Sequence, residues 1–425
     1  MKIHLDIDCY FVSAERSRYS FLKDKCVVVA KGSDKKIFSR AKKEWISLPK
    51  CGAFNGVLES KNSYSQDILG AWKEEFIDDD GSIHGIVIAK SYESKKFGIK
   101  TGTPLSQALH MCKDLIVLPS DHLFYQELSH RLREFLELKI PLLEQYSIDE
   151  FFGDLDGWID DKDTLAFITN LRDEIQERFH IPVSIGASKS KWIAKLVTDR
   201  IKPYGVYVLE SSEIQEYTKD IPIDNFPGIG RVISAALKKR MIFTLGELRD
   251  SSYLLRYGKA GKDLYARICG DDDESIIASR ERKAISISRN FTAIDDRDEL
   301  KRRVHILARY LSHNIAKLQL NPATFYLKIR YEYGTKRYKS ITIHRLFSEK
   351  LFLDTMRDMF QNLDSHKEQK IHYIAMSASN FDATQNPKTL NLLEYDNDRR
   401  FAELNQKLLK IRDRYGVDAI RYGCE

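Results

Sequence analysis

The chain has 425 residues and a formal net charge of +6, with 43% hydrophobic and 31% charged residues. This globular composition excludes wholesale disorder and a collagen-like fibre, and the length predicts about three domains. No uncharged apolar run reaches about 18 residues, the N-terminus lacks an apolar signal core, and the six cysteines include no Cys-x-x-Cys pair. We therefore expect a cytoplasmic protein without a membrane span, zinc site or disulfide framework.

The first half of the chain interleaves predicted strands with predicted helices, which indicates an α/β or α+β fold. Apolar and polar residues alternate over 2–8, so a strand there places Asp6 and Asp8 on one face. Tyr146 to Asp156 is typical of a hairpin that carries acids. Further strands are expected at 26–30, 85–89 and 183–186, and helices at 122–139, 164–179 and 190–200.

The second half is predicted to be helical over 222–282 and to form a separate α+β domain after about 284. Within it, residues 301–350 hold twelve Lys or Arg and two acids. Such a basic segment favours a polyanion such as nucleic acid, although charge alone fits a solvated surface equally well. Strands are expected at 284–291, 324–333, 339–344 and 371–377, and helices at 298–319 and 348–363.

Two acidic groups are candidate metal ligands: Asp6 with Asp8, and Asp149 with Glu150. Carboxylates on neighbouring strands can converge, and Mg²⁺ prefers such oxygen ligands together with substrate phosphates. Adjacent strand residues face opposite ways, so Asp149 and Glu150 can share a metal only where the strand turns or bulges. The alternative is one solvated acid and one salt-bridged acid, and Asp8 fits a hydrogen-bonding role as well as a ligand role.

Residues Asn225 to Arg231 resemble a helix-hairpin-helix turn. Its glycines permit tight backbone geometry, and the amides at the start of the next helix can hold a phosphate without reading base sequence. Ordinary turns also contain short Gly-Pro patterns. Together with the basic segment, however, this turn makes duplex nucleic acid the leading partner.

Five motifs in chain order together resemble the Y-family translesion DNA polymerases of the DNA polymerase IV or UmuC-like type. Each motif is weak alone, but the ordered set, over residues 1 to about 231, is specific. Beyond it the likeness extends only to charge and the closing Arg414-Tyr-Gly416. The motifs are Leu5-Asp-Ile-Asp-Cys-Tyr-Phe11, Ser91-Tyr-Glu-Ser-Lys-Lys-Phe-Gly-Ile99, Ser147-Ile-Asp-Glu150, Ser188-Lys-Ser-Lys-Trp-Ile-Ala-Lys195 with Lys202-Pro203, and Pro227-Gly-Ile-Gly230.

The resemblance implies an α+β multidomain chain with the right-hand polymerase architecture. It implies a palm (1–10 and 121–201), small fingers (11–120, with an insertion at 33–80), a helical thumb (202–282, with the helix-hairpin-helix near 225–240) and a C-terminal α+β little finger (285–425). The implied activity is template-directed, low-fidelity translesion DNA synthesis from dNTPs on a primer-template, with two Mg²⁺ ions.

Individual residues take roles from the resemblance. Asp6, Asp149 and Glu150 correspond to the catalytic metal ligands, with the carbonyl of Ile7 as a further ligand. Phe11 corresponds to the steric gate that fills the space of a ribose 2′-OH, and Tyr10 lies under the incoming sugar. Tyr92, Lys95 and Lys195 correspond to the triphosphate-binding residues. For DNA contacts we expect Gly228, Gly230 and Arg231 in the hairpin turn, and Arg302, Arg303 and Lys328 in the basic segment.

Three features depart from the family pattern. Lys95 replaces the usual Arg, which keeps the charge but loses bidentate phosphate geometry. The insertion at 33–80 is far longer than the usual connection, and we expect it to be inert surface or to bind a partner. Thr389-Leu-Asn-Leu-Leu393 resembles a degenerate sliding-clamp peptide without its leading Gln, and fits an ordinary apolar segment as well.

Two other functions are compatible with parts of the pattern. A non-catalytic, polymerase-like DNA-binding scaffold would not need Asp6, Asp149 and Glu150, yet all three are present. A nucleotidyl cyclase shares paired acids, but the hairpin turn and the basic segment count against it. No second acidic cluster suggests an exonuclease, so we expect no proofreading.

Overall fold

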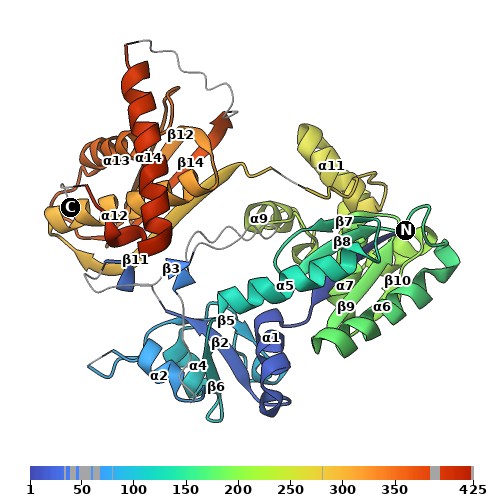
Figure 1. The fold of residues 1–425 in the computed structure, drawn as a ribbon. Helices are drawn as coiled ribbons and strands as arrows, with labels where there is room; N and C mark the ends of the chain where they lie inside the picture. The colour runs from blue at the N-terminus through green and yellow to red at the C-terminus, as the bar shows by residue number, and fades with distance from the viewer. Residues whose placement is uncertain are drawn as a thin grey trace.

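The computed structural model places four groups of elements along the chain (Figure 1). No helix among the placed residues is both long and apolar enough to cross a bilayer. The structure describes residues 1–32, 35–38, 45–46, 59–60, 68–78, 80–279, 281–382 and 393–422.

A five-stranded sheet of order β10-β9-β1-β8-β7 carries β1 at its centre. The odd-numbered residues of β1, such as Leu5, belong to the hydrophobic core shared with α5 and α6. The opposite face carries α7, which approaches so closely that a Cβ on Gly186 would lie 2.5 Å from the carbonyl oxygen of Ala194. The elements are β1 (Lys2–Ile7), β7 (Leu142–Gln145), β8 (Glu150–Asp154), β9 (Val183–Ser188), β10 (Val206–Val208), α5 (His122–Glu137), η3 (Asp161–Asp163), α6 (Thr164–Phe179) and α7 (Lys191–Ile201).

A second, three-stranded sheet has the order β5-β2-β6, with β2 parallel to β6 and antiparallel to β5. Its apolar strands, among them Val27–Lys31, form a small core with α2 and α4. The elements are α1 (Tyr10–Arg18), η1 (Ser20–Leu22), β2 (Val27–Lys31), η2 (Lys35–Phe38), α2 (Ala71–Phe76), β5 (Ile86–Lys90), α3 (Tyr92–Lys95), α4 (Leu105–Met111) and β6 (Ile116–Pro119). Two short strands, β3 (Trp45–Ile46) and β4 (Glu59–Ser60), pair antiparallel as a separate two-stranded sheet.

A helical region follows, as predicted for 222–282. Its core joins these helices to α7 through Trp192 and Ile193. The elements are η4 (Ser211–Glu213), α8 (Ile214–Thr218), η5 (Ile223–Asn225), α9 (Arg231–Lys238), α10 (Leu245–Ser251), η6 (Tyr253–Arg256) and α11 (Gly258–Cys269).

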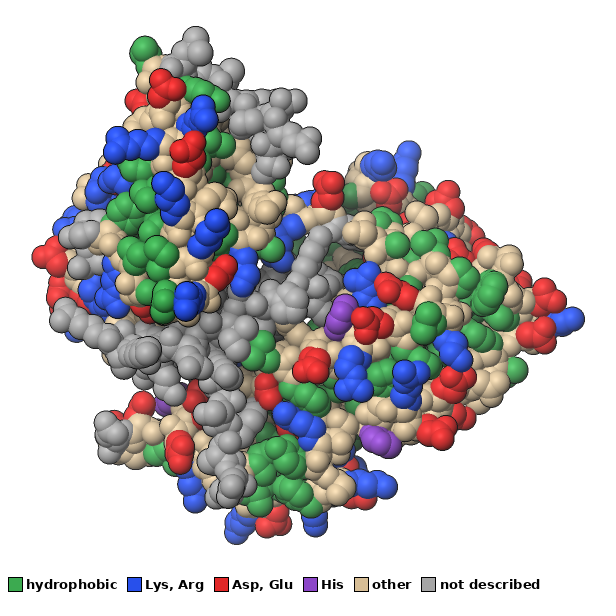
Figure 2. All heavy atoms as spheres, viewed as in Figure 1, with side chains coloured by type: hydrophobic (Ala, Val, Ile, Leu, Met, Phe, Trp, Pro, Cys, Tyr) green, Lys and Arg blue, Asp and Glu red, His purple; other side chains and the backbone are tan. Residues whose placement is uncertain are grey.

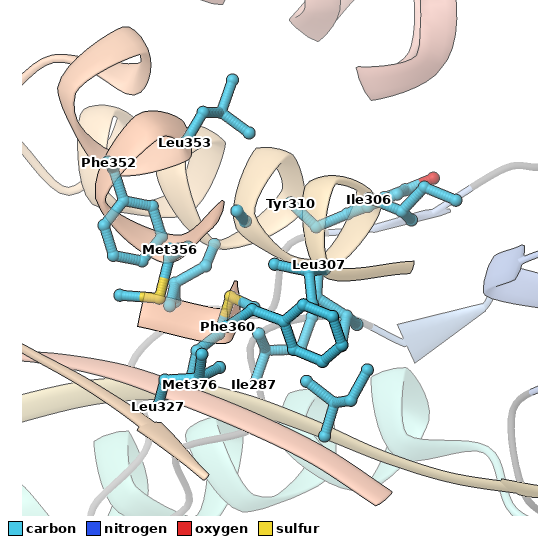
Figure 3. Packing of buried hydrophobic residues seen from close by; sticks show 14 of the residues in the cluster. Ile287, Ile306, Leu307, Tyr310, Leu327, Phe352, Leu353, Met356, Phe360 and Met376 are labelled. Carbon is cyan, nitrogen blue, oxygen red and sulfur yellow. The ribbon is translucent and has the colours of Figure 1, made fainter. Parts of the chain in front are cut away.

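The C-terminal domain is an antiparallel sheet of order β11-β14-β12-β13 with helices on one face. Figure 3 shows Ile287, Leu327 and Met376 of the sheet meeting Leu307 and Phe360 of the helices. The elements are β11 (Ala284–Ile294), α12 (Arg297–Lys317), β12 (Asn321–Tyr331), β13 (Lys336–Thr342), α13 (Glu349–Leu363), β14 (Ile371–Asp382), α14 (Tyr395–Tyr415) and η7 (Val417–Ala419).

The other face of this sheet, which we call the open face, carries small, polar and basic side chains. Opposed residues in antiparallel strands share a face, so the register places Ser288, Ala375, Lys328 and Tyr338 in one row across all four strands. Figure 2, viewed with α14 in front, shows Lys and Arg side chains on the helix side of the C-terminal domain as well.

Two residues from the predicted insertion lie in the core of the C-terminal domain. Ile37 and Phe38 of η2 are 1% and 6% exposed and belong to the same hydrophobic cluster as Phe291. The Phe38 ring meets Phe291 edge-on at 5.7 Å between centroids. The guanidinium of Arg303 lies 4.6 Å from each ring centroid. We call this group the Phe38 contact; it joins the first half of the chain to the C-terminal domain.

Candidate active site

Strand pairing brings together Asp6, Asp149 and Glu150, which we call the acidic cluster. Asp6 of β1 lies directly opposite Glu150 of β8 in the antiparallel register. Asp149 lies in the bend just before β8, where its carbonyl accepts a hydrogen bond of 3.0 Å from the amide of Ile7. This bend releases Asp149 from strand alternation, which otherwise sends adjacent side chains to opposite faces.

Each acid of the cluster has its own partner. The Lys202 ammonium lies 2.7 Å from Asp6 Oδ2, and the Lys195 ammonium bonds Glu150 Oε1. Ser147 Oγ donates to Asp149 Oδ1 at 2.5 Å. Within the described part of the chain, no group of three or more His, Cys, Asp or Glu side chains is arranged so that it could hold a metal ion as it stands.

The pKa values of two acids reflect this crowding. Burial raises the pKa of Asp6 well above its ordinary value; Lys202 partly offsets the rise, and the charges of Asp149 and Glu150 add to it. Burial also raises the pKa of Asp149, offset by the Ser147 hydrogen bond and reinforced by Glu150. Mutually repelling carboxylates are the donor set that a hard divalent cation neutralises, so these residues fit Mg²⁺.

Asp8 is 1% exposed and its carboxylate is held by protein groups. It accepts hydrogen bonds from Ser184 Oγ at 3.0 and 3.2 Å, from the Tyr204 amide at 2.8 Å and from the Tyr92 hydroxyl at 3.3 Å. These partners favour the hydrogen-bonding role that the sequence left open beside a ligand role.

The predicted nucleotide-binding residues lie on α1, α3 and α7. Tyr10 is buried, and its hydroxyl bonds the carbonyl of Tyr125, whereas Phe11 is half-buried. Tyr92 reaches Asp8, which places α3 next to the end of β1. Lys95 is exposed, with its ammonium 5.9 Å from the centroid of the Tyr92 ring.

The hairpin turn precedes α9, as its sequence predicts. Gly228 has a φ of +98°, a left-handed conformation that favours glycine. No described atom lies within 4 Å of the position that a Cβ on Gly230 would take, so the backbone at the start of α9 is accessible. Arg231, the first residue of α9, is exposed beside it.

The three basic residues predicted to bind DNA are divided between the two faces of the C-terminal domain. Lys328 lies on the open face and forms no salt bridge with any described residue. Arg302 and Arg303 lie on α12 and bond Glu299 at 2.6 and 2.7 Å. Arg302 also donates to the Phe38 carbonyl at 2.8 Å.

Sequence analysis did not find Lys202 as the partner of Asp6, or Ser184 as a partner of Asp8. Lys202 lies 196 residues from Asp6, and only the Lys-Pro dipeptide marked its position.

The proposed clamp peptide lies outside the described residues except for Leu393, which is exposed. Most of 33–80 also lies outside them.

Comparisons with known proteins agree on the family. The impB/mucB/samB family model matches residues 5–199, and the model of its C-terminal domain matches 282–392. A DNA polymerase IV of Staphylococcus epidermidis is 30% identical over 261 residues, which cover 60% of this chain and 73% of that protein. A DNA polymerase IV of Vibrio parahaemolyticus is 28% identical over 212 residues, which cover 49% of this chain and 60% of the relative.

Solved structures share the fold. A Y-family DNA polymerase chimera of Dbh and Dpo4 superposes with a TM-score of 0.71 at 20% identity, over 89% of this chain and 98% of the other. DinB from Sulfolobus solfataricus superposes with a TM-score of 0.52 at 20% identity, over 89% of this chain and 98% of DinB. The architecture is therefore that of a right-hand polymerase, and the predicted α+β multidomain fold is confirmed. The chain belongs to the impB/mucB/samB family, the Y-family of translesion DNA polymerases. The predicted domain boundaries remain predictions.

Proposed function

We propose that this chain is a DNA-directed DNA polymerase that performs low-fidelity translesion synthesis. Family membership supports the activity class, and relatives named DNA polymerase IV support the reaction. The match to the first of these relatives covers 60% of its length. The observation that carries the proposal is the acidic cluster, assembled by β1 and β8 beside Lys195 and Lys202.

In the proposed reaction, the primer 3′-OH attacks the α-phosphate of a dNTP and pyrophosphate leaves. The carboxylates of Asp6, Asp149 and Glu150, with the carbonyl of Ile7, would hold two Mg²⁺ ions, and the ions would supply charge neutralisation of the phosphates and activation of the hydroxyl. Lys195 and Lys95 would balance charge on the triphosphate. Tyr92, whose ring centroid lies 5.9 Å from the Lys95 ammonium, donates its hydroxyl to Asp8. Such positioning supplies most of the catalysis in phosphoryl transfer.

We infer that primer-template DNA lies against two surfaces. The accessible backbone at Gly228 and Gly230, with Arg231, can bind phosphates at the start of α9. The open face of the C-terminal sheet offers Lys328 and hydroxyl groups. A solved relative, described as an insertion ternary complex of Dbh DNA polymerase, shares the fold with a TM-score of 0.55. Clamp binding near 389–393 and a cytoplasmic location stay predictions.

Primer extension with Mg²⁺ and dNTPs, on undamaged and damaged templates, tests the proposal. Asp149→Ala should lower extension about 10³-fold or more, because a ligand of the metal ions is lost. Its circular dichroism spectrum and DNA affinity should match the wild type. Asp250→Ala, which removes an exposed carboxylate on α10, is the control and should extend normally.

Three other outcomes of these assays would each contradict part of the proposal. Normal extension by Asp149→Ala would refute the metal assignment. DNA binding without extension by the wild-type chain would favour the non-catalytic scaffold. A cyclic product from ATP or GTP without DNA would favour a cyclase.

A further inference from the structure

The ring of Phe11 lies flat against a second aromatic ring that the sequence motifs do not include. Phe11 stacks on Tyr125 with 4.5 Å between ring centroids and 15° between ring planes. His122 meets Phe11 edge-on at 5.4 Å and 88°. Phe11 lies in the first turn of α1, and the other two rings lie in the first turn of α5. The stack thus joins two helices.

Tyr125 is fixed from several directions. Its side chain is fully buried, and its hydroxyl donates to Glu15 Oε1 at 2.6 Å. Glu15 is 1% exposed and accepts two hydrogen bonds of 2.8 Å from Arg18. Arg18 bonds Asp121 at 3.0 Å at the N-cap of α5. The ring of Tyr125 is therefore held by a closed set of hydrogen bonds between α1 and α5.

Phe11 differs from Tyr125 because it is half-buried and carries no polar atom that could anchor it. Its orientation depends on the rings packed against it. A side chain that excludes a hydroxyl group by bulk works only while it keeps one rotamer, because rotation about χ1 or χ2 opens the excluded space. Aromatic stacking supplies the restraint that Phe11 lacks.

We propose that Tyr125 is a positioning residue that holds Phe11 in its excluding orientation and thereby sets the selection of deoxyribonucleotides over ribonucleotides. This inference rests on the proposed function, in which Phe11 fills the space of the 2′-OH. Tyr125 acts through Phe11 and makes no contact with the nucleotide. The hydrogen bond from the Tyr125 hydroxyl to Glu15 is less important for this role, because the ring of Tyr125 forms the stack with Phe11.

The test measures kcat/KM for dCTP and for rCTP opposite template dG, on the same preparation of the full chain. The ratio of the two constants does not depend on the folded fraction, so partial misfolding of a variant does not affect it. Tyr125→Leu should lower the ratio about 3- to 10-fold, the range expected for losing one aromatic stack. The change should come from faster rCTP use. Tyr125→Met, an unbranched side chain that adapts to the site, replaces Tyr125→Leu if that variant does not fold.

Two further variants separate positioning from general packing. Tyr125→Phe keeps the stack and should keep most of the wild-type ratio. Phe11→Ala should lower the ratio most, and adding Tyr125→Leu to it should change the ratio no further, because the two residues act in series.

An unchanged ratio in Tyr125→Leu, with normal dCTP use, would overturn the inference. Additive effects in the double variant would also overturn it. Failure of the wild-type chain to extend any primer with dNTPs would instead refute the proposed function, on which the inference rests.

Discussion

Lys202 supplies the half-buried positive charge next to Asp6. The two side chains are 23% and 9% exposed, so this ion pair is far less hydrated than a surface pair. Leaving a buried charge without its partner destabilises the folded state more than losing an exposed pair. Lys202 thus balances part of the negative charge of the acidic cluster.

We therefore predict that Lys202→Met lowers the free energy of unfolding by about 2 kcal/mol at pH 7 in EDTA. Mg²⁺ should restore more stability to this variant than to the wild type, because the ion replaces the missing positive charge. Urea unfolding with and without Mg²⁺ measures both effects. The control is Lys189→Met, which removes an exposed partner of Asp161. An equal Mg²⁺ effect in wild type and Lys202→Met would contradict the prediction.

The two faces of the C-terminal sheet carry different side chains: one face packs against the helices, and the other is the open face. Ile287, Met376 and Leu327 lie in one row beneath the helices, and the next row, Ser288, Ala375 and Lys328, lies on the open face. A one-residue shift in register would exchange the two sets. The hydrophobic pattern of the strands thus fixes which basic residues can reach a polyanion.

We predict that Lys328→Ala makes the negative slope of log K against log salt for duplex DNA shallower by about 0.9, the value for one lost phosphate contact. Arg302→Gln should leave the slope unchanged, since Glu299 and the Phe38 carbonyl already occupy its guanidinium. Fluorescence anisotropy at several salt concentrations measures both slopes. A shallower slope in Arg302→Gln, with an unchanged slope in Lys328→Ala, would show that Arg302 releases its partners to bind DNA.

Periodicity predicted most elements of the fold, because burial on one face sets the pattern. The helix at 164–179 and the strands near 2–8 and 183–186 were expected within two residues of their observed bounds. The helix α14 (Tyr395–Tyr415) was not among the expected elements, although Phe401, Leu404, Leu408 and Ile411 recur at helical spacing between its charged residues. Strand pairing could be expected to bring Asp6 close to Glu150. The lysine partners could not be, since their position depends on how α7 packs across the sheet.

At the scale of the whole molecule, the Phe38 contact links parts of the chain that are more than 250 residues apart. Its ionic part resists acid. Hydrogen bonds from Arg302 and Arg303 lower the pKa of Glu299 from 4.5 to about 2. A lowered carboxyl pKa stabilises the folded state fully above pH 4.5, and that contribution is lost progressively as the pH falls from 4.5 through about 2. The ion pairs that Glu299 forms with Arg302 and Arg303 on α12 should therefore persist at pH 4.

We predict that Phe38→Ala loosens the C-terminal domain and raises the radius of gyration of the DNA-free protein in small-angle scattering. The ring fills the space between Phe291 and Arg303, so its loss leaves a cavity that the backbone hydrogen bond to Arg302 does not close. Trypsin should also cut faster at Lys283, in the exposed connection before β11. Phe21→Ala, which removes a half-exposed ring in η1, is the control. Superimposable scattering curves for Phe38→Ala and wild type would rule out this linking role.

The central position of β1 has a consequence for biosynthesis. Both neighbours of β1 lie far downstream, at Glu150–Asp154 and Val183–Ser188. During translation, Asp6 leaves the ribosome long before either neighbouring strand exists, so the sheet cannot close until most of the first half has been made. The carboxylates of the acidic cluster thus become neighbours late, and a nascent chain stalled before residue 150 lacks the cluster.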